Sequence, residues 1–123
     1  MCAKRVEDLE IWQLGNELRE KTYALINTSK KPLDPKFRSE IEDALASIMK
    51  NISEGFGRWN HKEFAQFLRY ARGSTFENAE CVKDGVARGY WTLSATPAVL
   101  NLCEREQKAL AGFIKYLKSN PDP

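Results

Sequence analysis

Apolar residues recur along most of the chain at steps of three and four, the spacing that places side chains on one face of an α-helix. The clearest stripe starts after Asp34-Pro35, an N-cap residue followed by proline, and stops at a glycine-containing segment, Gly55-Phe56-Gly57. This pattern predicts a helix over residues 35–57. Its apolar members are Phe37, Ile41, Leu45, Ile48, Ile52 and Phe56.

Two later stripes have equally clear boundaries. Asn60, with Glu63 three residues on, predicts a helix over about 61–88 that ends where Gly89 permits a left-handed C-cap. Thr96-Pro97, again an N-cap residue followed by proline, predicts another helix over about 97–118, and Tyr90 and Trp91 are expected in the turn between the two helices. The two apolar stripes are Phe64, Phe67, Leu68, Ala71, Val82 and Val86, then Val99, Cys103, Leu110, Ile114 and Leu117.

The first predicted helix, over about 7–28, has two apolar stripes instead of one. They consist of Leu9, Trp12, Tyr23 and Ile26 on one face, and of Ile11, Leu14, Leu18 and Leu25 on the other. One interpretation is a wide core face, and the other is a contact between copies of the chain, with the second stripe and the polar rows described below at or near it. The two interpretations predict different molecular masses.

No segment alternates with period two for long enough to predict a strand, and 123 residues suit one domain. Four helices joined by short turns favour an all-α, antiparallel up-down-up-down four-helix bundle, with a single domain over 1–123. The chain begins with charged residues and no apolar run, so we expect a cytoplasmic protein without a signal peptide or membrane span.

The ionisable residues give little support to catalysis. Cys2, Cys81 and Cys103 lack CxxC spacing, which indicates reduced thiols, and a di-iron bundle needs Glu-x-x-His pairs on two helices, whereas His61 is the single histidine. The Gly55–Arg58 segment lacks the spacing of a phosphate loop. We therefore expect no enzyme, no metal and no cofactor.

Two polar rows flank the predicted core faces of the second and third helices. They are Ser47, Asn51, Glu54 and Arg58 in one row, and Glu63, Tyr70, Ser74, Glu77 and Cys81 in the other. Because buried polar groups need partners, the rows favour a hydrogen-bonded network that fixes helix or subunit register. A solvated surface and a catalytic glutamate pair are the alternatives.

A basic stripe lies on the face of the third predicted helix that points away from its core. It consists of Lys62, Arg69, Arg72 and Lys83, with Phe76 among them and Arg58 nearby. Clustered cations attract phosphates and an exposed ring can stack on a base, which favours a nucleic-acid site. A solvated helix face is the alternative, because Glu80 lies on the same side and the formal net charge is only +2.

Several motifs resemble those of the 23S ribosomal RNA intervening-sequence family. They are NISEGFGR at 51–58, then Lys62-Glu63-Phe64, Phe67-Leu68, Ala71, Gly73-Ser74 and Glu77, and the opening Asp8-Leu9-Glu10-Ile11-Trp12. Ser53 replaces the family's usual alanine, and Thr75 a frequent leucine. The likeness covers most of the chain and is weakest in the last helix and tail.

The resemblance implies a four-helix bundle that assembles into a homopentameric ring. Such a ring is similar to the accessory protein of diversity-generating retroelements, which binds nucleic acid and a reverse transcriptase. The resemblance implies no enzymatic activity. Some bacteria encode family members inside ribosomal RNA insertions. Our leading hypothesis is a non-enzymatic, oligomeric accessory protein that binds RNA or DNA, and the alternative is a protein-interaction scaffold.

Overall fold

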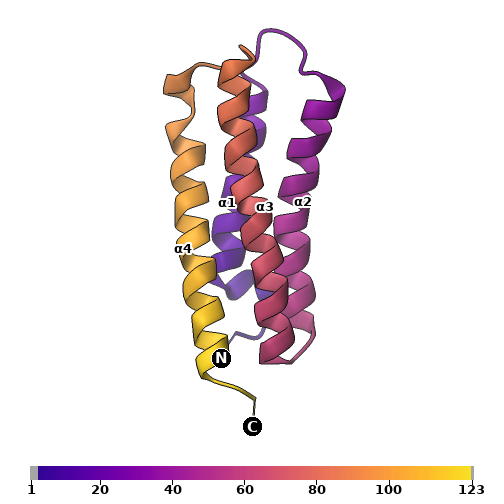
Figure 1. Cartoon of the computed structure of the whole chain (residues 1–123), viewed down its shortest axis with the longest axis vertical. Helices are drawn as coiled ribbons and strands as arrows, with labels where there is room; N and C mark the ends of the chain where they lie inside the picture. Colours follow the sequence, from indigo (N-terminus) through magenta and orange to yellow (C-terminus); the bar gives the residue numbers. More distant parts are fainter. Residues whose placement is uncertain (1–2, 123) are drawn as a thin grey trace.

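Four α-helices and two short 3₁₀ helices make up residues 3–122, which are the residues that this computed structural model describes. Figure 1 shows the four α-helices side by side, with the α1–α2 and α3–α4 connections at one end and the α2–α3 connection at the other. The elements are η1 (Val6–Asp8), α1 (Glu10–Ile26), α2 (Pro35–Gly57), α3 (His61–Ala87), η2 (Leu93–Ala95) and α4 (Pro97–Ser119).

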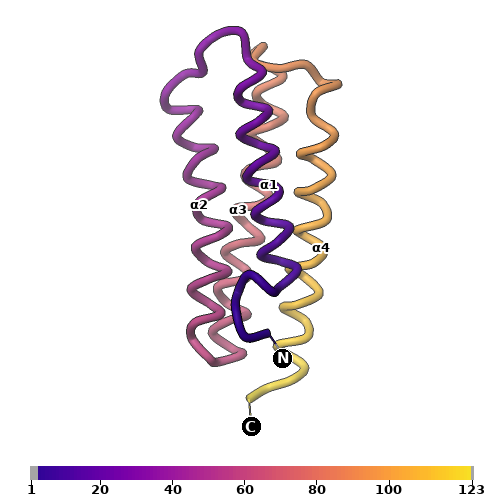
Figure 2. The backbone as a smooth tube through the Cα atoms, turned by 180° about the vertical axis from the view of Figure 1, so that it is seen from behind, coloured from indigo at the N-terminus to yellow at the C-terminus, as the bar shows by residue number. Residues whose placement is uncertain are grey.

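Each helix runs antiparallel to its neighbours, and α1 packs against both α2 and α4, as the rear view in Figure 2 also shows. This arrangement closes the four helices around one core. The expected all-α, up-down-up-down bundle is confirmed. No helix within residues 3–122 combines the length and apolarity that a membrane span requires.

Side-chain caps fix the starts of α2 and α3. The carboxylate of Asp34 and the side-chain oxygen of Asn60 each accept a hydrogen bond from the backbone N–H three residues later, at 3.1 and 2.9 Å. Thr96 differs from the expectation, because its hydroxyl donates to the carbonyl of Leu93 at 2.7 Å and caps nothing. Pro97 still opens α4, since a first helical residue needs no N–H donor.

The first helix is shorter than the pattern predicts. Leu9 has extended backbone angles (φ −79°, ψ 137°) between η1 and α1, so the helix begins at Glu10. At the other end α1 stops at Ile26, and the hydroxyl of Thr28 donates to the carbonyl of Leu25 in the following turn.

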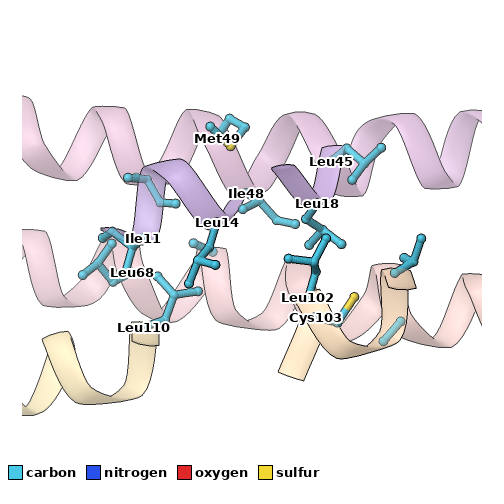
Figure 3. Packing of buried hydrophobic residues seen from close by; sticks show 14 of the residues in the cluster. Ile11, Leu14, Leu18, Leu45, Ile48, Met49, Leu68, Leu102, Cys103 and Leu110 are labelled. Atoms are coloured by element: carbon cyan, nitrogen blue, oxygen red, sulfur yellow. The ribbon is translucent and has the colours of Figure 1, made fainter. Parts of the chain in front are cut away.

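The inner face of α1 lies in the core of the single chain. Figure 3 shows its leucine and isoleucine side chains among those of α2, α3 and α4. The prediction that this stripe lies at a subunit contact is wrong, since all four of its members are at most 7 % exposed. They are Ile11, Leu14, Leu18 and Leu25.

The other stripe of α1, given first in the sequence analysis, is also largely covered. Leu9 and Ile26 are buried, and Trp12 and Tyr23 lie half-buried at the margin of the core. The wide core face is therefore the interpretation that the packing confirms, because neighbouring helices cover α1 on more than one side.

The glycines near the interhelical turns have different roles. Gly89 takes the left-handed conformation (φ 79°) directly after the C-cap residue Arg88, as expected. Gly55 instead lies buried inside α2, where a Cβ atom would come within 2.7 Å of the Phe64 ring, so it permits close packing of α3 and does not form the turn. The residue with a positive φ (54°) in the α2–α3 turn is Trp59.

Candidate nucleic-acid interface

The outer face of α3 holds the cations that the sequence singles out. Leu68, Ala71 and Thr75 are buried against the bundle, so the residues that follow each of them along the helix point outward. Those residues include Arg69, Arg72 and Phe76. They line a hollow of about 430 Å³ together with Gly73 and, from the neighbouring helix α4, Gln107. We call these five residues the α3–α4 notch.

The two arginines of the notch have no carboxylate partner within residues 3–122. Arg69 donates only to the side-chain oxygen of Gln66, at 2.8 Å, and both arginines are exposed. Phe76 is 57 % exposed, although burial of an aromatic ring is energetically favourable. The notch therefore presents two available guanidinium groups beside an unburied ring.

The remaining members of the predicted basic stripe lie apart from the notch. Lys62 is exposed in the first turn of α3, about two helical turns before Arg69. Lys83 pairs with Glu80 at 3.4 Å, which offsets its charge. Arg58 lies on the opposite flank, where its guanidinium group stacks over the Phe67 ring at 5.1 Å.

The two predicted polar rows meet at one place. The hydroxyls of Ser47 on α2 and Ser74 on α3 are 2.7 Å apart, and the amide of Asn51 donates to the Ser47 hydroxyl at 3.0 Å and to its carbonyl at 2.8 Å. These three half-buried residues connect α2 to α3 in the way that the sequence predicts for a network that fixes register.

The structure does not bring the other members of the rows into this network. Glu54 pairs with Arg58 at 2.8 Å on α2, and the hydroxyl of Tyr70 accepts from Gln66 at 2.9 Å on α3. Glu77 is exposed and makes no hydrogen bond or ion pair among the described residues. These side chains are long and solvent-exposed, so burial does not force them to find a partner across the two helices.

A buried polar cluster inside the bundle was missed by the sequence analysis. The amide of Asn78 on α3 donates to the Thr22 hydroxyl on α1 at 3.2 Å and lies 3.9 Å from the sulfur of Cys103 on α4. One turn beyond Cys103, Glu106 is fully buried, and neither of its oxygens has a hydrogen-bond partner within residues 3–122.

Burial determines the protonation of this cluster. Removal from water raises the pKa of the Glu106 carboxyl to about 8, with a smaller contribution from the charge of Glu10. Burial also raises the pKa of the Cys103 thiol to about 11 and that of the Cys81 thiol. Both cysteines are unbridged and poorly suited to nucleophilic chemistry, whereas Cys2 lies outside the described residues.

His61 has a structural environment at the first position of α3. Its backbone N–H donates to the carboxylate of Asp122 at 2.7 Å, and its ring contacts the carbonyl of Asn120. The tail after α4 therefore packs across the start of α3, where the helix leaves N–H groups unpaired.

Together the fold and these surfaces define a small antiparallel four-helix bundle with an exposed basic face on its third helix and a polar contact between its second and third. The chain belongs to the 23S rRNA-intervening sequence protein family, whose sequence model matches residues 7–112. The match includes α1 to α3 and most of α4. A comparison with curated proteins finds no match.

Proposed function

We propose that this protein is a non-enzymatic accessory protein of a ribonucleoprotein, which binds nucleic acid through the α3–α4 notch. The observation that carries the proposal is the pair of arginines, Arg69 and Arg72, which face solvent next to an exposed ring and have no carboxylate partner in the described part of the chain. A guanidinium group can hold a phosphate through two parallel hydrogen bonds, and a neighbouring aromatic side chain can contact sugar or base. Membership in the intervening-sequence family also supports a role with nucleic acid.

The test is charge reversal in the notch. The double variant Arg69→Glu and Arg72→Glu should weaken binding of a structured RNA or DNA by about tenfold or more at near-physiological salt, because two phosphate contacts become repulsive. Fluorescence anisotropy with a labelled hairpin measures the affinity.

The matched control reverses two exposed lysines on other helices, Lys21 of α1 and Lys36 in the first turn of α2. Each reversal changes the charge by two units, so both double variants lower the formal net charge from +2 to −2. The proposal requires the control to retain most of the wild-type affinity. Equal losses in the two variants would show a diffuse electrostatic effect and no site on α3.

We also propose that copies of the chain assemble into the homopentameric ring, through the flank formed by α2 and α3. This flank holds the Ser47–Ser74 contact and the NISEGFGR segment, and Trp59 at its end is 77 % exposed. A bulky residue held at positive φ is strained, and strain of this kind concentrates at functional sites. Light scattering should give about 70 kDa for five 14.1 kDa chains, and a monomeric mass would contradict the ring.

A protein-interaction scaffold is the second candidate function. It is favoured by the exposed aromatic residues outside the notch, Trp59 (77 %) and Tyr70 (52 %), which a protein partner such as a reverse transcriptase could cover. Isolation of the protein from its native host, with sequencing of bound RNA and identification of bound proteins, distinguishes the two functions. A protein partner without any bound nucleic acid would favour the scaffold.

A further inference from the structure

The α3–α4 notch contains features that phosphate binding alone does not use. Phe76 exposes more than half of its surface, and no aromatic ring among the described residues packs against it. At Gly73, three residues earlier, a Cβ atom would meet no atom of the described residues within 4 Å, so the space beside the ring is open.

The opposite wall of the notch is polar. Gln107 on α4 lines the hollow, and its amide makes no hydrogen bond within residues 3–122. An amide both donates and accepts, as does the edge of a nucleobase. The hollow of about 430 Å³ thus combines two cations, an apolar ring and an amide.

These groups differ in what they recognise. Guanidinium groups attract the phosphates of single and double strands alike. An exposed ring interacts with the flat face of a base, which a duplex covers by stacking and a single strand leaves accessible. Stacking on Phe76 would therefore add affinity only when the nucleic acid has an unpaired base, whose free edge could also reach the Gln107 amide.

We infer that the α3–α4 notch accepts an unpaired nucleotide of a single strand. The base lies against Phe76 with its edge toward Gln107, and the flanking phosphates lie at Arg69 and Arg72. This inference rests on the proposed function, because it names the form of nucleic acid that the same surface prefers.

The test compares a short labelled single strand, a blunt duplex of the same sequence, and the same single strand with abasic sites, each made as RNA and as DNA. The wild-type protein should bind the intact single strand about tenfold more tightly than the duplex or the abasic strand, since stacking of one base contributes about that factor. The RNA and DNA arms show which sugar the surface prefers.

Phe76→Leu should remove this preference. It keeps an apolar side chain at an exposed position but lacks the ring, so the affinity for the single strand should fall about tenfold while that for the duplex stays within about twofold. The double variant Arg69→Glu with Arg72→Glu should lose affinity for the single strand and for the duplex.

The outcomes separate the two claims. Equal wild-type affinity for the three ligands, or a Phe76→Leu variant that keeps the wild-type preference, would overturn the unpaired-base site and leave phosphate binding intact. If the wild-type protein binds none of them, the proposed function fails, and this inference fails with it.

Discussion

Glu106 of α4 lies directly opposite Gly15 of α1, and a Cβ atom at Gly15 would come within 2.8 Å of a Glu106 carboxylate oxygen. The glycine provides the space that the buried carboxyl group occupies. Both residues are buried, and they lie where α1 packs against α4. A carboxyl group in such a site is more stable in its neutral form.

We predict that Glu106 makes stability depend on pH. Because burial raises its pKa from the usual 4.5 to about 8, the folded state binds a proton that the unfolded state releases between these values. The free energy of unfolding therefore does not change with the Glu106 proton below the unfolded pKa. As the pH rises from the unfolded to the folded pKa, it falls by about 1.4 kcal/mol per pH unit. Denaturant titrations between about pH 5 and about pH 9 measure it.

The matched control for this prediction is Glu106→Gln, which keeps the shape of the side chain and cannot ionise in this range. The difference in free energy of unfolding between wild type and variant should move in favour of the variant as the pH rises. Parallel pH profiles for the two proteins would mean that the Glu106 carboxyl titrates normally.

The packing of Trp91 on α3 gives a second prediction. A Cβ atom at Gly85 would lie 2.1 Å from the Trp91 ring, which is 6 % exposed and held by an indole N–H bond to the carbonyl of Val82 at 2.8 Å. Gly85→Ala should therefore destabilise the protein by about 2 kcal/mol or more, despite the better helix propensity of alanine. Thermal and chemical unfolding check this effect.

The control for this helical glycine is Gly112→Ala on α4, where a Cβ atom would meet nothing from residues 3–122 within 4 Å. Removal of backbone freedom should stabilise this variant by about 1 kcal/mol. A Gly85→Ala variant as stable as Gly112→Ala would contradict the described position of Trp91.

The Ser47–Ser74 contact gives a third prediction. Ser47→Ala and Ser74→Ala should each destabilise the protein by about 1 kcal/mol, with the larger effect at Ser47, which also accepts from Asn51. The double variant should lose less than the sum, since the second change removes a hydroxyl that already lacks its partner. Additive losses would show that the two hydroxyls do not interact, and Ser39→Ala on the exposed face of α2 should change little.

The fold was largely predictable because local signals coincide with the packing. Asp34 and Asn60 are caps that the sequence marks and the structure confirms, and the apolar stripes identify the buried faces of α2 to α4. The start of α1 was not predictable to the residue, since the extended backbone of Leu9 depends on contacts of η1 with the bundle. Periodicity also could not show whether both stripes of α1 pack in the core of one chain or one of them contacts another copy of the chain.

The candidate site was predictable only in part. Helical spacing places Arg69, Arg72 and Phe76 on one outward face, but whether Arg58 joins them depends on the side of α3 that α2 covers. Gln107 comes from another helix and has no signal in the α3 pattern. The signal for Glu106 was present, because it lies three residues after Cys103 and four before Leu110 on the predicted core stripe.

The salt dependence of nucleic-acid affinity tests the central claim most directly. Each phosphate contact releases counterions, so removing two of them with Arg69→Ala and Arg72→Ala should lower the magnitude of the slope of log K against log salt by about 1.4 to 1.8. We predict this smaller slope together with weaker binding. A double variant with the wild-type slope and the wild-type affinity would contradict binding through the α3–α4 notch.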